Sequence, residues 1–389
     1  MSNEPSMGTG TFLAHFGEDW RTRGEVVPPI YQNSLFVFER TEDLAHSLLA
    51  HEPENFHYSR VSNPTLHQLE TAVARLEGCE RAKAYSSGIA AIFAVVAAFT
   101  QQGSHVVMPD TAYYPSRLTL DPFFSRFGVT YTLVDGRSVE SIAEAITPET
   151  RLIYLESPSS FLMRLQDLEA VAQLAKNRGI VTVCDNTYAT PLFQQPVKFG
   201  IDLVVHSASK YLGGHSDLTA GIVCGSNEHL QKMISTDLLV LGSALAPFPA
   251  WLVMRGMRSL KLRMQHAQQV GDRIARWLQQ SPEVRTVHHP SLPEHPQHEL
   301  FLRQMSGTSS LVSFTPNRQD QEAAFAFCDQ LKLFGRGVSW GGHESLAIPL
   351  QLDCSGLDEP TWVIRLSLGL EDPEDLESDL DQALETLRI

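Results

Sequence analysis

Short apolar runs alternate with segments of helical periodicity between about residues 64 and 244. The runs are rich in β-branched residues and end at polar or glycine residues, which is typical of buried strands. In most of the intervening segments, apolar residues recur with the spacing of one helix face. The predicted strands have the sequences AKAYSS, HVVMPD, VTYTLVD, LIYLES, IVTVCDN, LVVHSAS and GIVCG.

This alternation predicts an α/β fold with a mostly parallel, seven-stranded sheet covered by helices on both faces. Helices are predicted in PTLHQLETAVARLEG, GIAAIFAVVAAFTQQG and DLEAVAQLAKNRG. In such sheets, ligands bind beyond the carboxyl ends of the strands. We therefore expect functional side chains at the points where predicted strands end.

The pattern changes at both ends of this segment and divides the chain into three predicted parts. Residues 1–60 carry little periodicity and are expected to form an extended N-terminal arm, and residues 61–245 the large domain. Residues 246–389 are expected to form a smaller C-terminal α/β domain. It begins with one long helix from about Ala250 to Gln280, and continues with the strand LVSF, the helix DQEAAFAFCDQLKLF, the strand VIRLSLGL and an acidic terminal helix.

Composition and charge narrow the classes of function. Of the 389 residues, 43% are hydrophobic and 19% are charged, as in an ordinary globular protein. The formal net charge of −15 argues against nucleic-acid binding, which requires a basic surface. No apolar stretch approaches the about 18–20 residues of a membrane-spanning helix, so we expect no membrane association. The N-terminal residues do not resemble a secretory signal, and a cytoplasmic location is expected.

The cysteines and histidines predict neither a disulfide framework nor a metal site. The five cysteines are scattered, without a Cys-x-x-Cys pair, as in a reduced intracellular protein. A proline-rich loop contains His288, His289, His295 and His298, but their spacing fits no helical or finger-type metal site. We expect this loop to be exposed and to hold no metal ion.

The most informative segment is DLVVHSASKYLGGHSD, in which a predicted strand ends at Ser207-Ala208-Ser209-Lys210 before a glycine-rich turn. The two hydroxyls can hydrogen-bond phosphate oxygens. A partly desolvated lysine has a lowered pKa and becomes a usable amine nucleophile. The segment therefore combines a candidate anion site with a candidate reactive amine.

Two further segments end predicted strands in the same way. Asp185 lies 25 residues before Lys210, and a carboxylate there can hold a ring nitrogen protonated. Ser86-Ser87-Gly88-Ile89 separates a strand from an apolar helix, whose N-terminal N–H groups can bind phosphate. Each segment alone also has an ordinary structural explanation: a surface lysine in a polar turn, a capping aspartate, or a Ser/Gly helix cap. Together they supply an amine, a carboxylate and an anion-binding loop at the carboxyl ends of strands.

Other common nucleotide-binding sites are absent from the sequence. No Gly-x-x-x-x-Gly-Lys-Ser/Thr loop is present, which argues against a nucleoside-triphosphate enzyme. No Gly-x-Gly-x-x-Gly follows a predicted strand, which argues against a Rossmann dehydrogenase.

With these motifs, the sequence resembles the fold-type I pyridoxal-phosphate (PLP) enzymes of the Cys/Met-metabolism family, and is most similar to their bacterial cystathionine β-lyases. The similarity extends from Tyr58-Ser59-Arg60 to Gly369-Leu370-Glu371-Asp372. SASKYLGGHSD is its most specific motif, supported by DTAYYPSR, ESPSS, DNTYATP and SWGGHESL. The resemblance implies a PLP-dependent transferase-like fold, PLP as the cofactor and a small sulfur amino acid as the substrate.

The resemblance also implies roles for individual residues. Lys210 matches the lysine that holds the cofactor covalently and later moves a proton. Asp185 matches the partner of the ring nitrogen, and Tyr113 matches the aromatic residue that stacks on the ring. The phosphate-binding positions are matched by Gly88, Ile89, Ser207 and Ser209.

Further matches concern the substrate and the assembly. Arg365 resembles the arginine that binds the substrate α-carboxylate, and Ser339 and Trp340 lie in the substrate-binding motif SWGGHESL. Tyr58 and Arg60 match a pair that reaches into the neighbouring subunit's site, Arg60 to the phosphate and Tyr58 near the reacting centre. This implies an obligate dimer within a tetramer.

The expected reaction is β-elimination of L-cystathionine to homocysteine, pyruvate and ammonia, a transsulfuration step of methionine biosynthesis. Cysteine and S-substituted cysteines are further expected substrates. Many members of the family have Asn at the position of Ser160. The β-lyases resemble this chain in having Ser there. The γ-synthases and γ-lyases often have glutamate where this chain has Val338, which favours β-chemistry. The first alternative is a γ-lyase or γ-synthase of the same family. The second, less similar alternative is a regulatory or binding protein with the same fold, in which catalysis is incidental.

Overall fold

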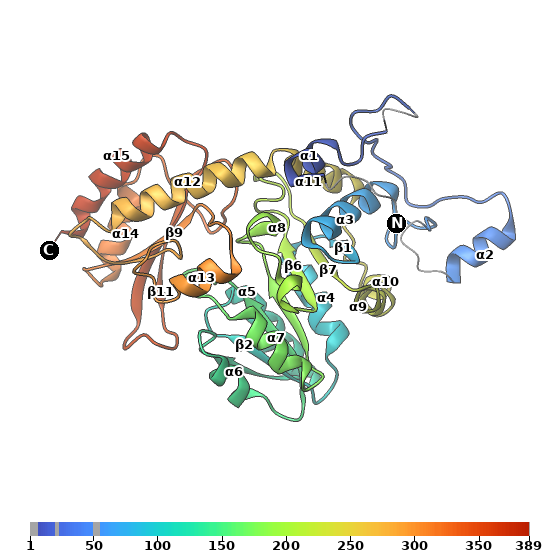
Figure 1. The fold of residues 1–389 in the computed structure, drawn as a ribbon, viewed down its shortest axis with the longest axis horizontal. Coiled ribbons are helices and arrows are strands. Elements are labelled where there is room, and N and C mark those ends of the chain that lie inside the picture. Colours follow the sequence, from blue (N-terminus) through green and yellow to red (C-terminus); the bar gives the residue numbers. More distant parts are fainter. Residues whose placement is uncertain (1–6, 20–22, 50–54, 389) are drawn as a thin grey trace.

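A seven-stranded sheet forms the centre of the chain. The computed structural model describes residues 7–19, 23–49 and 55–388 (Figure 1). The strand order is β1-β7-β6-β5-β4-β2-β3, and only β7 runs antiparallel to its neighbours. The predicted strands and the mostly parallel sheet are thus confirmed. The strands are β1 (Arg81–Tyr85), β2 (His105–Pro109), β3 (Thr130–Val134), β4 (Thr150–Glu156), β5 (Val181–Asp185), β6 (Leu203–Ser207) and β7 (Gly221–Gly225).

Helices cover both faces of this sheet because its strands are apolar on both faces. In β4, Leu152 and Tyr154 join the core beneath α4, whereas Ile153 and Leu155 join the core beneath α7. The predicted helices are α3, α4 and α7. The helical segments are α3 (Pro64–Glu77), α4 (Gly88–Phe99), α5 (Tyr114–Leu118), η1 (Thr119–Phe123), η2 (Phe124–Phe127), α6 (Val139–Ala145), α7 (Leu168–Lys176), α8 (Thr190–Phe193), η3 (Pro196–Phe199), α9 (Asn227–Met233), η4 (Ile234–Leu238) and α10 (Leu239–Leu241).

A smaller, mostly antiparallel sheet follows, with the order β10-β11-β12-β9-β8. LVSF and VIRLSLGL form β9 and β12, as predicted, but β8, β10 and β11 were not predicted. The predicted helix DQEAAFAFCDQLKLF is shorter and ends at Gln330. The elements are β8 (Val284–His288), α13 (His298–Gln304), β9 (Leu311–Pro316), α14 (Gln321–Gln330), β10 (Gly335–Arg336), β11 (Leu346–Leu352), β12 (Thr361–Ser367), α15 (Pro373–Leu384) and η5 (Glu385–Leu387).

The long helix predicted from Ala250 to Gln280 is two helices, α11 (Pro247–Arg258) and α12 (Leu260–Leu278), so the prediction of one helix was wrong. Ser259 separates them, with φ −96° and ψ 1°. The guanidinium of Arg263 donates to the carbonyl oxygens of Tyr211, at 2.7 Å, and Gly256, at 2.8 Å, and thereby ties this junction to the segment after β6. Beyond the junction, α12 extends from the core of the large sheet into the core of the small sheet.

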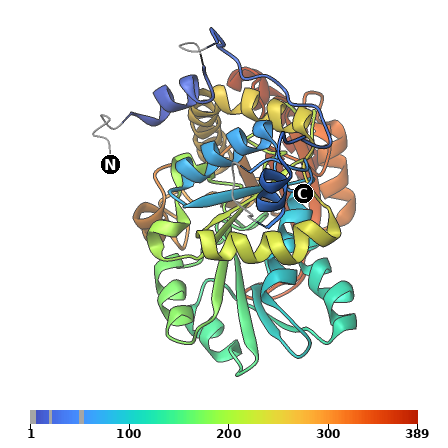
Figure 2. The same ribbon diagram turned by 90° about the vertical axis from the view of Figure 1, so that its right-hand side faces the viewer.

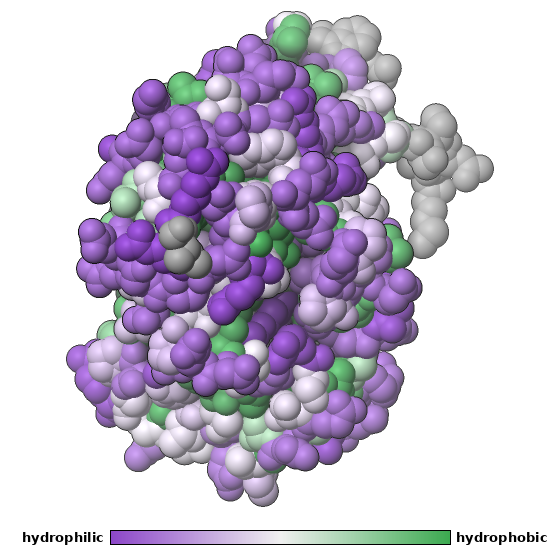
Figure 3. Space-filling model, turned by 90° about the vertical axis from the view of Figure 1, so that its left-hand side faces the viewer, coloured by the Kyte–Doolittle hydropathy of each residue, from purple (hydrophilic) through white to green (hydrophobic). Residues whose placement is uncertain are grey.

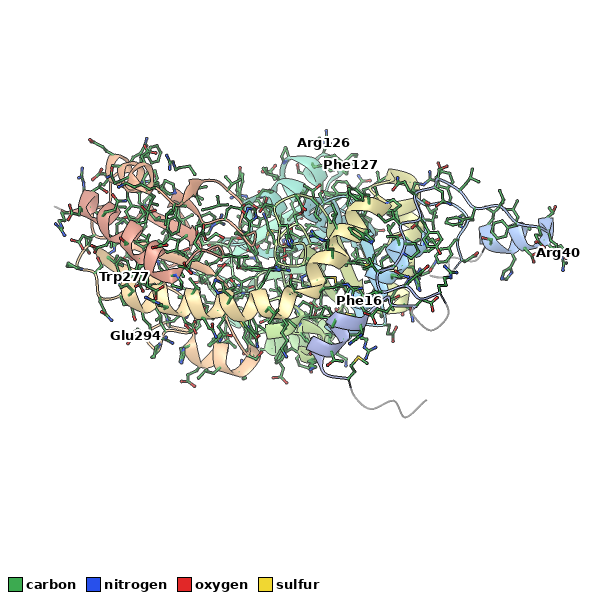
Figure 4. All side chains as sticks on the ribbon, turned by 90° about the horizontal axis from the view of Figure 1, so that it is seen from above. Phe16, Arg40, Arg126, Phe127, Trp277 and Glu294 are labelled. Carbon is green, nitrogen blue, oxygen red and sulfur yellow. The ribbon has the colours of Figure 1, made fainter. Side chains whose placement is uncertain are left out.

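The described part of the N-terminal arm contains α1 (Thr9–His15) and α2 (Thr41–Leu49). Phe12 and Leu13 of α1 are buried against α11 and α12, and Arg258 donates to the carbonyl oxygen of Phe16 at 3.2 Å. In contrast, α2 stands away from the rest of the chain in Figure 1 and in the view from above, where Arg40 marks its N-terminal side (Figure 4). Half of the arm therefore lies against its own chain and half projects from it.

The turned view shows the same arrangement, with helices on either side of the central strands (Figure 2). The face at the end of the small sheet is mostly hydrophilic, with scattered apolar residues (Figure 3). Among the helices of the described residues, none is both long and apolar enough to cross a bilayer.

Candidate active site

The predicted functional residues gather at one edge of the large sheet. Glu156, Asp185 and Ser207 are the last residues of the parallel strands β4, β5 and β6. Lys210 lies in the turn that follows β6. Because parallel strands end at a common edge, these residues lie close together although they are far apart in the sequence. This edge, beyond the carboxyl ends of the strands, is where ligands of such sheets bind.

The N-terminus of α4 forms an anion-binding loop next to β6. The hydroxyl of Ser87 caps this helix by accepting from the backbone N–H of Ala90 at 3.2 Å. A Cβ at Gly88 would lie 2.8 Å from Cβ and Oγ of Ser207, so only glycine permits this close approach. The first N–H groups of a helix have no partner within it, so those of Gly88 and Ile89 can bind phosphate.

Ser207 and Ser209, the two serines predicted to bind the phosphate, differ in their surroundings. Ser207 contacts Gly88, and its backbone N–H donates to the hydroxyl of Thr187 at 2.8 Å. The hydroxyl of Ser209 donates to the carbonyl oxygen of Ala220 at 3.2 Å and accepts from its N–H at 3.0 Å. Ser207 therefore lies at the loop, whereas the Ser209 hydroxyl is engaged with the start of β7.

Asp185 is a buried carboxylate, only 8% exposed. Its Oδ1 accepts from the backbone N–H of Thr187 at 3.0 Å and from the hydroxyl of the same residue, and its Oδ2 accepts from Tyr154 at 3.4 Å. Burial raises its pKa, because a carboxylate loses hydration there. It has no ion pair with any described residue. A protonated ring nitrogen, such as that of PLP, would supply the missing positive charge, so this carboxylate fits the cofactor.

Lys210 is held by residues that precede β11 of the small sheet. Its Nζ donates to Oγ of Ser339 at 2.6 Å and lies 5.6 Å from the ring centroid of Trp340. Burial, and then the positive charge of Arg365, lowers the pKa of Lys210 to about 8. Its amine is therefore neutral in a much larger fraction of molecules at physiological pH than that of an ordinary lysine.

Arg365 of β12 is 4% exposed, and its Nη2 donates to the carbonyl oxygen of Val338 at 2.8 Å. Its Cζ lies 4.6 Å from the ring centroid of Phe161. Burial lowers its pKa to about 10, which still leaves the guanidinium charged at neutral pH. No carboxylate among the described residues forms an ion pair with it. This buried cation can therefore bind a carboxylate supplied by a ligand.

Glu156 was not predicted as a site residue. Its Oε2 accepts from the backbone N–H of Tyr113 at 2.6 Å, and its Oε1 accepts from the hydroxyl of Ser160. Burial, and then the neighbouring charge of Asp185, raises the pKa of Glu156 to about 8. The sequence did carry a signal for it, since an acidic residue ends the apolar strand LIYLES just as Asp185 ends its strand. Glu156 anchors the backbone of Tyr113, a residue that is 45% exposed.

Tyr58 and Arg60 lie together, and no hydrogen bond or ion pair of the described residues joins them to Lys210. The Cζ of Arg60 is 5.0 Å from the Tyr58 ring centroid, and the Tyr58 residue is 41% exposed. Arg60 lies beside Gly242, directly after α10. Within the described part of the chain, neither side chain hydrogen-bonds or pairs with the groups around Lys210.

A cavity of about 340 Å³ adjoins the site. Phe161, which contacts Arg365, and Ser160, which contacts Glu156, form part of its wall. Asp110 and Arg117 place charges of opposite sign in the same wall. Oδ1 of Asp110 is buried and has no hydrogen-bond partner among the described residues.

Comparison with known proteins gives one family over nearly the whole chain. A family model described as Cys/Met metabolism PLP-dependent enzyme matches residues 10–385. A cystathionine gamma-lyase of Bacillus subtilis (strain 168) is 38% identical over 97% of this chain and 99% of its own length. A cystathionine beta-lyase of Lactococcus lactis subsp. cremoris (strain MG1363) is 37% identical over 94% of this chain and 95% of its own. The crystal structure of metB from Corynebacterium glutamicum has a TM-score of 0.91 and 35% identity, over 98% of this chain and 99% of that one. The chain belongs to the family of Cys/Met metabolism PLP-dependent enzymes.

Proposed function

We propose that this enzyme cleaves the C–S bond of L-cystathionine by β-elimination, which yields homocysteine, pyruvate and ammonia. Cysteine and S-substituted cysteines are further proposed substrates, because they carry the same reacting carbons. The family supports a PLP-dependent lyase or synthase of sulfur amino acids. The choice of β-elimination rests on the residues around Lys210.

Pyridoxal 5′-phosphate is the cofactor of this family. When bound, it supplies an aldehyde that exchanges amines and a ring that accepts the electron pair left at the substrate Cα. We assign its covalent attachment to Lys210, its ring nitrogen to Asp185, and its phosphate to the N-terminus of α4 with Ser207. Tyr113 is proposed to stack on the ring.

Lys210 is proposed to act as the general base once the substrate amine has displaced it. With a pKa of about 8, its amine is poised to accept the Cα proton near neutral pH. Ser339 Oγ orients this amine through the 2.6 Å hydrogen bond. Arg365 is proposed to bind the substrate carboxylate and so fix Cα opposite Nζ of Lys210.

Val338 is the observation that carries the choice of β-chemistry. It occupies the position where γ-synthases and γ-lyases often have a glutamate, and it offers no side-chain carboxylate. Its carbonyl oxygen accepts from Arg365, so it lies directly beside the proposed carboxylate site. β-Elimination requires one base at Cα and loss of the thiolate from Cβ, and Lys210 supplies that base.

The adjoining cavity supports a substrate with a second amino-acid end. In L-cystathionine this end carries an ammonium and a carboxylate. The unpartnered Oδ1 of Asp110 suits the ammonium and the guanidinium of Arg117 suits the carboxylate. Cysteine lacks this second end, so it would not use the cavity.

We also propose that the enzyme works as a dimer within a tetramer, in which the arm of one subunit completes the site of its neighbour. The arm exposes apolar side chains that a neighbouring subunit would cover, since large exposed apolar surface is typical of interaction sites. Val26, Leu35, Val37 and Leu48 are 65%, 52%, 88% and 55% exposed, respectively. Arg60 is the residue proposed to reach the neighbour's phosphate.

A product assay on L-cystathionine tests the proposed reaction. β-Elimination produces pyruvate and homocysteine, whereas γ-elimination produces 2-oxobutyrate and cysteine. The γ-lyase relative keeps this alternative open. Pyruvate as the main product supports the proposal, and 2-oxobutyrate as the main product contradicts it. If neither product forms but an activated homoserine condenses with cysteine, the enzyme is a γ-synthase and the proposal is wrong.

A further inference from the structure

A second cavity, of about 350 Å³, shares Leu162 with the cavity beside the proposed active site. Its wall contains Arg137 and Arg164, from the loops after β3 and β4, and Arg285 of β8. None of the residues assigned above to cofactor or substrate lines it. The cavity thus lies where loops of the large sheet meet the small sheet.

The histidines of the proline-rich loop belong to this region, and the prediction that their loop is exposed was wrong. His289 is fully buried and His295 is 8% exposed. Burial lowers the pKa of His288 to about 3 and that of His295 to about 4, so both are neutral at physiological pH. His288 and His295 line the cavity. The described residues contain no group of three or more His, Cys, Asp or Glu side chains able to hold a metal ion.

Arg164 is the central observation. The residue is 7% exposed, and its Nη1 is buried without a hydrogen-bond partner among the described residues. It also forms no ion pair with any of them. Asp135, whose pKa is lowered mainly by Arg137 and also by the charge of Arg164, is already held by Arg137 through hydrogen bonds of 2.9 Å to Nε and 2.6 Å to Nη2. A buried guanidinium without a partner is costly unless a ligand supplies the acceptor.

The charge of the wall points to an anion. Glu294 is the one carboxylate among the residues of the wall, and it accepts from Nε2 of Gln279 at 3.0 Å. Of the three guanidinium groups in the wall, that of Arg137 is paired with Asp135, whereas those of Arg164 and Arg285 form no ion pair with any described residue. Figure 4 shows Glu294 on the same side of the molecule as Trp277 of α12. This cationic wall occurs on a chain whose formal net charge is −15, so it does not reflect the average composition.

We propose that this cavity binds the phosphate or sulfate group of a small metabolite. The guanidinium groups of Arg164, in the loop after β4, and Arg285, in β8, can each donate to separate oxygens of a tetrahedral oxyanion. Pockets for small molecules begin at about 300 Å³, so the cavity has room for a group larger than the bare ion. The proposal does not depend on which sulfur amino acid the enzyme cleaves.

Calorimetric titration of the PLP-saturated holoenzyme tests this site. Inorganic phosphate, inorganic sulfate and glycerol 3-phosphate are the probes, at an ionic strength held constant with sodium chloride. Tighter binding of glycerol 3-phosphate than of the two ions identifies a phosphorylated metabolite as the ligand class. Tighter binding of an inorganic ion identifies a free oxyanion. Either result supports the proposed site only if Arg164→Gln and Arg285→Gln bind the probe more weakly than the wild type.

Arg164→Gln removes the unpartnered donor and is expected to weaken binding by about tenfold or more. Arg285→Gln replaces an exposed residue of the same wall, so we expect the variant to fold. We expect this substitution to weaken binding of the probe severalfold. Arg178→Gln is the matched control, because Arg178 is exposed after α7 and is absent from the cavity wall. Lyase activity without the probe is expected to stay unchanged in all three variants.

The proposal is overturned if the wild-type holoenzyme binds none of the probes. It is also overturned if Arg164→Gln and Arg285→Gln bind them as tightly as the wild type, because binding would then occur elsewhere. If Arg164→Gln does not fold, wild-type affinity in Arg285→Gln alone has the same consequence. A loss of affinity equal to that of Arg178→Gln would indicate a general charge effect and would equally contradict the site.

Discussion

Lys210 and Ser339 are joined by a hydrogen bond of 2.6 Å between Nζ and Oγ, although 129 residues separate them in the sequence. Lys210 follows a strand of the large sheet, and Ser339 precedes β11 of the small sheet. The reactive amine is thus positioned by the contact between two parts of the chain. Substitutions at that contact should change catalysis without changing either sheet.

We expect Lys210→Ala to lower kcat for pyruvate formation by about 10³-fold or more, because both the covalent attachment and the general base are lost. The measurement is pyruvate release from L-cystathionine, with the visible spectrum recorded to check for bound cofactor. Ser339→Ala is the comparison, since it removes only the hydrogen bond to Nζ, and a smaller decrease is expected. Normal pyruvate production by Lys210→Ala would show that the assignment of Lys210 is wrong.

Arg365→Lys should raise KM by about tenfold or more and change kcat less. Lysine keeps the charge but loses the two parallel donors that suit a carboxylate. Steady-state kinetics with L-cystathionine and with L-cysteine measure the effect, and both substrates should respond because both carry the α-carboxylate. Arg336→Lys, at the exposed β10, is a control expected to behave as the wild type. An unchanged KM in Arg365→Lys would contradict the carboxylate role.

Gly88→Ala should lower the affinity for PLP by about tenfold or more, because the added Cβ would lie 2.8 Å from Ser207 and displace the phosphate loop. Absorbance titration of the apoenzyme with PLP measures this affinity. Gly8→Ala is the control, since a Cβ at Gly8 meets no atom within 4 Å. Equal affinities in the two variants would indicate that the phosphate does not bind at α4.

The contribution of Glu156 to the stability of the apoenzyme should fall as the pH rises from about 4.5 to 8, while the buried histidines, with their lowered pKa values, contribute with the opposite sign up to about pH 6.5. The pKa of Glu156 is raised from 4.5 to about 8 in the folded chain, so the folded state holds this proton more tightly than the unfolded state. Its contribution to stability is present below pH 4.5 and is lost as the pH passes through 8. The raised pKa of Asp185 acts with the same sign.

Thermal unfolding midpoints at several pH values measure this dependence. Glu156→Gln, which mimics the protonated carboxyl, should become more stable relative to the wild type as the pH rises from about 4.5 to 8, because it lacks the proton that the wild type loses there. A difference between the wild-type and Glu156→Gln midpoints that stays constant from pH 5 to 8 would show that this carboxyl is ionised in the folded state.

Two inactive variants should restore activity when they share a dimer. Lys210→Ala disables a subunit's own site, whereas Arg60→Ala disables the neighbour's site if the arm reaches across. Mixed dimers then contain one site with both residues intact. Reversible denaturation and refolding of the mixture, followed by the pyruvate assay, tests this expectation. Activity no higher than that of the separate variants would place Arg60 in its own subunit's site or outside the site.

The sequence by itself determined the large sheet and the main groups at its edge. Most of its strands are apolar runs, such as IVTVCDN, because the sheet is buried on both faces, and this signal is local. Lys210 and Asp185 could be found because their strands end there, and parallel strands must end at one edge. The family motifs added the proposed roles. The division at residues 60 and 245 stays a prediction, and α12 extends across the cores of both sheets.

Only the tertiary structure decided the features that depend on distant partners. The break at Ser259 is held by hydrogen bonds of Arg263 to Gly256 and Tyr211, which no local pattern of the helix encodes. The buried histidine loop and the unpartnered Arg164 depend on which loops the two sheets bring together. Glu156 has the same sequence signal as Asp185, but its raised pKa arises from burial beside that second carboxylate. Electrostatic effects of this kind are set by distance and desolvation, and both are properties of the folded chain.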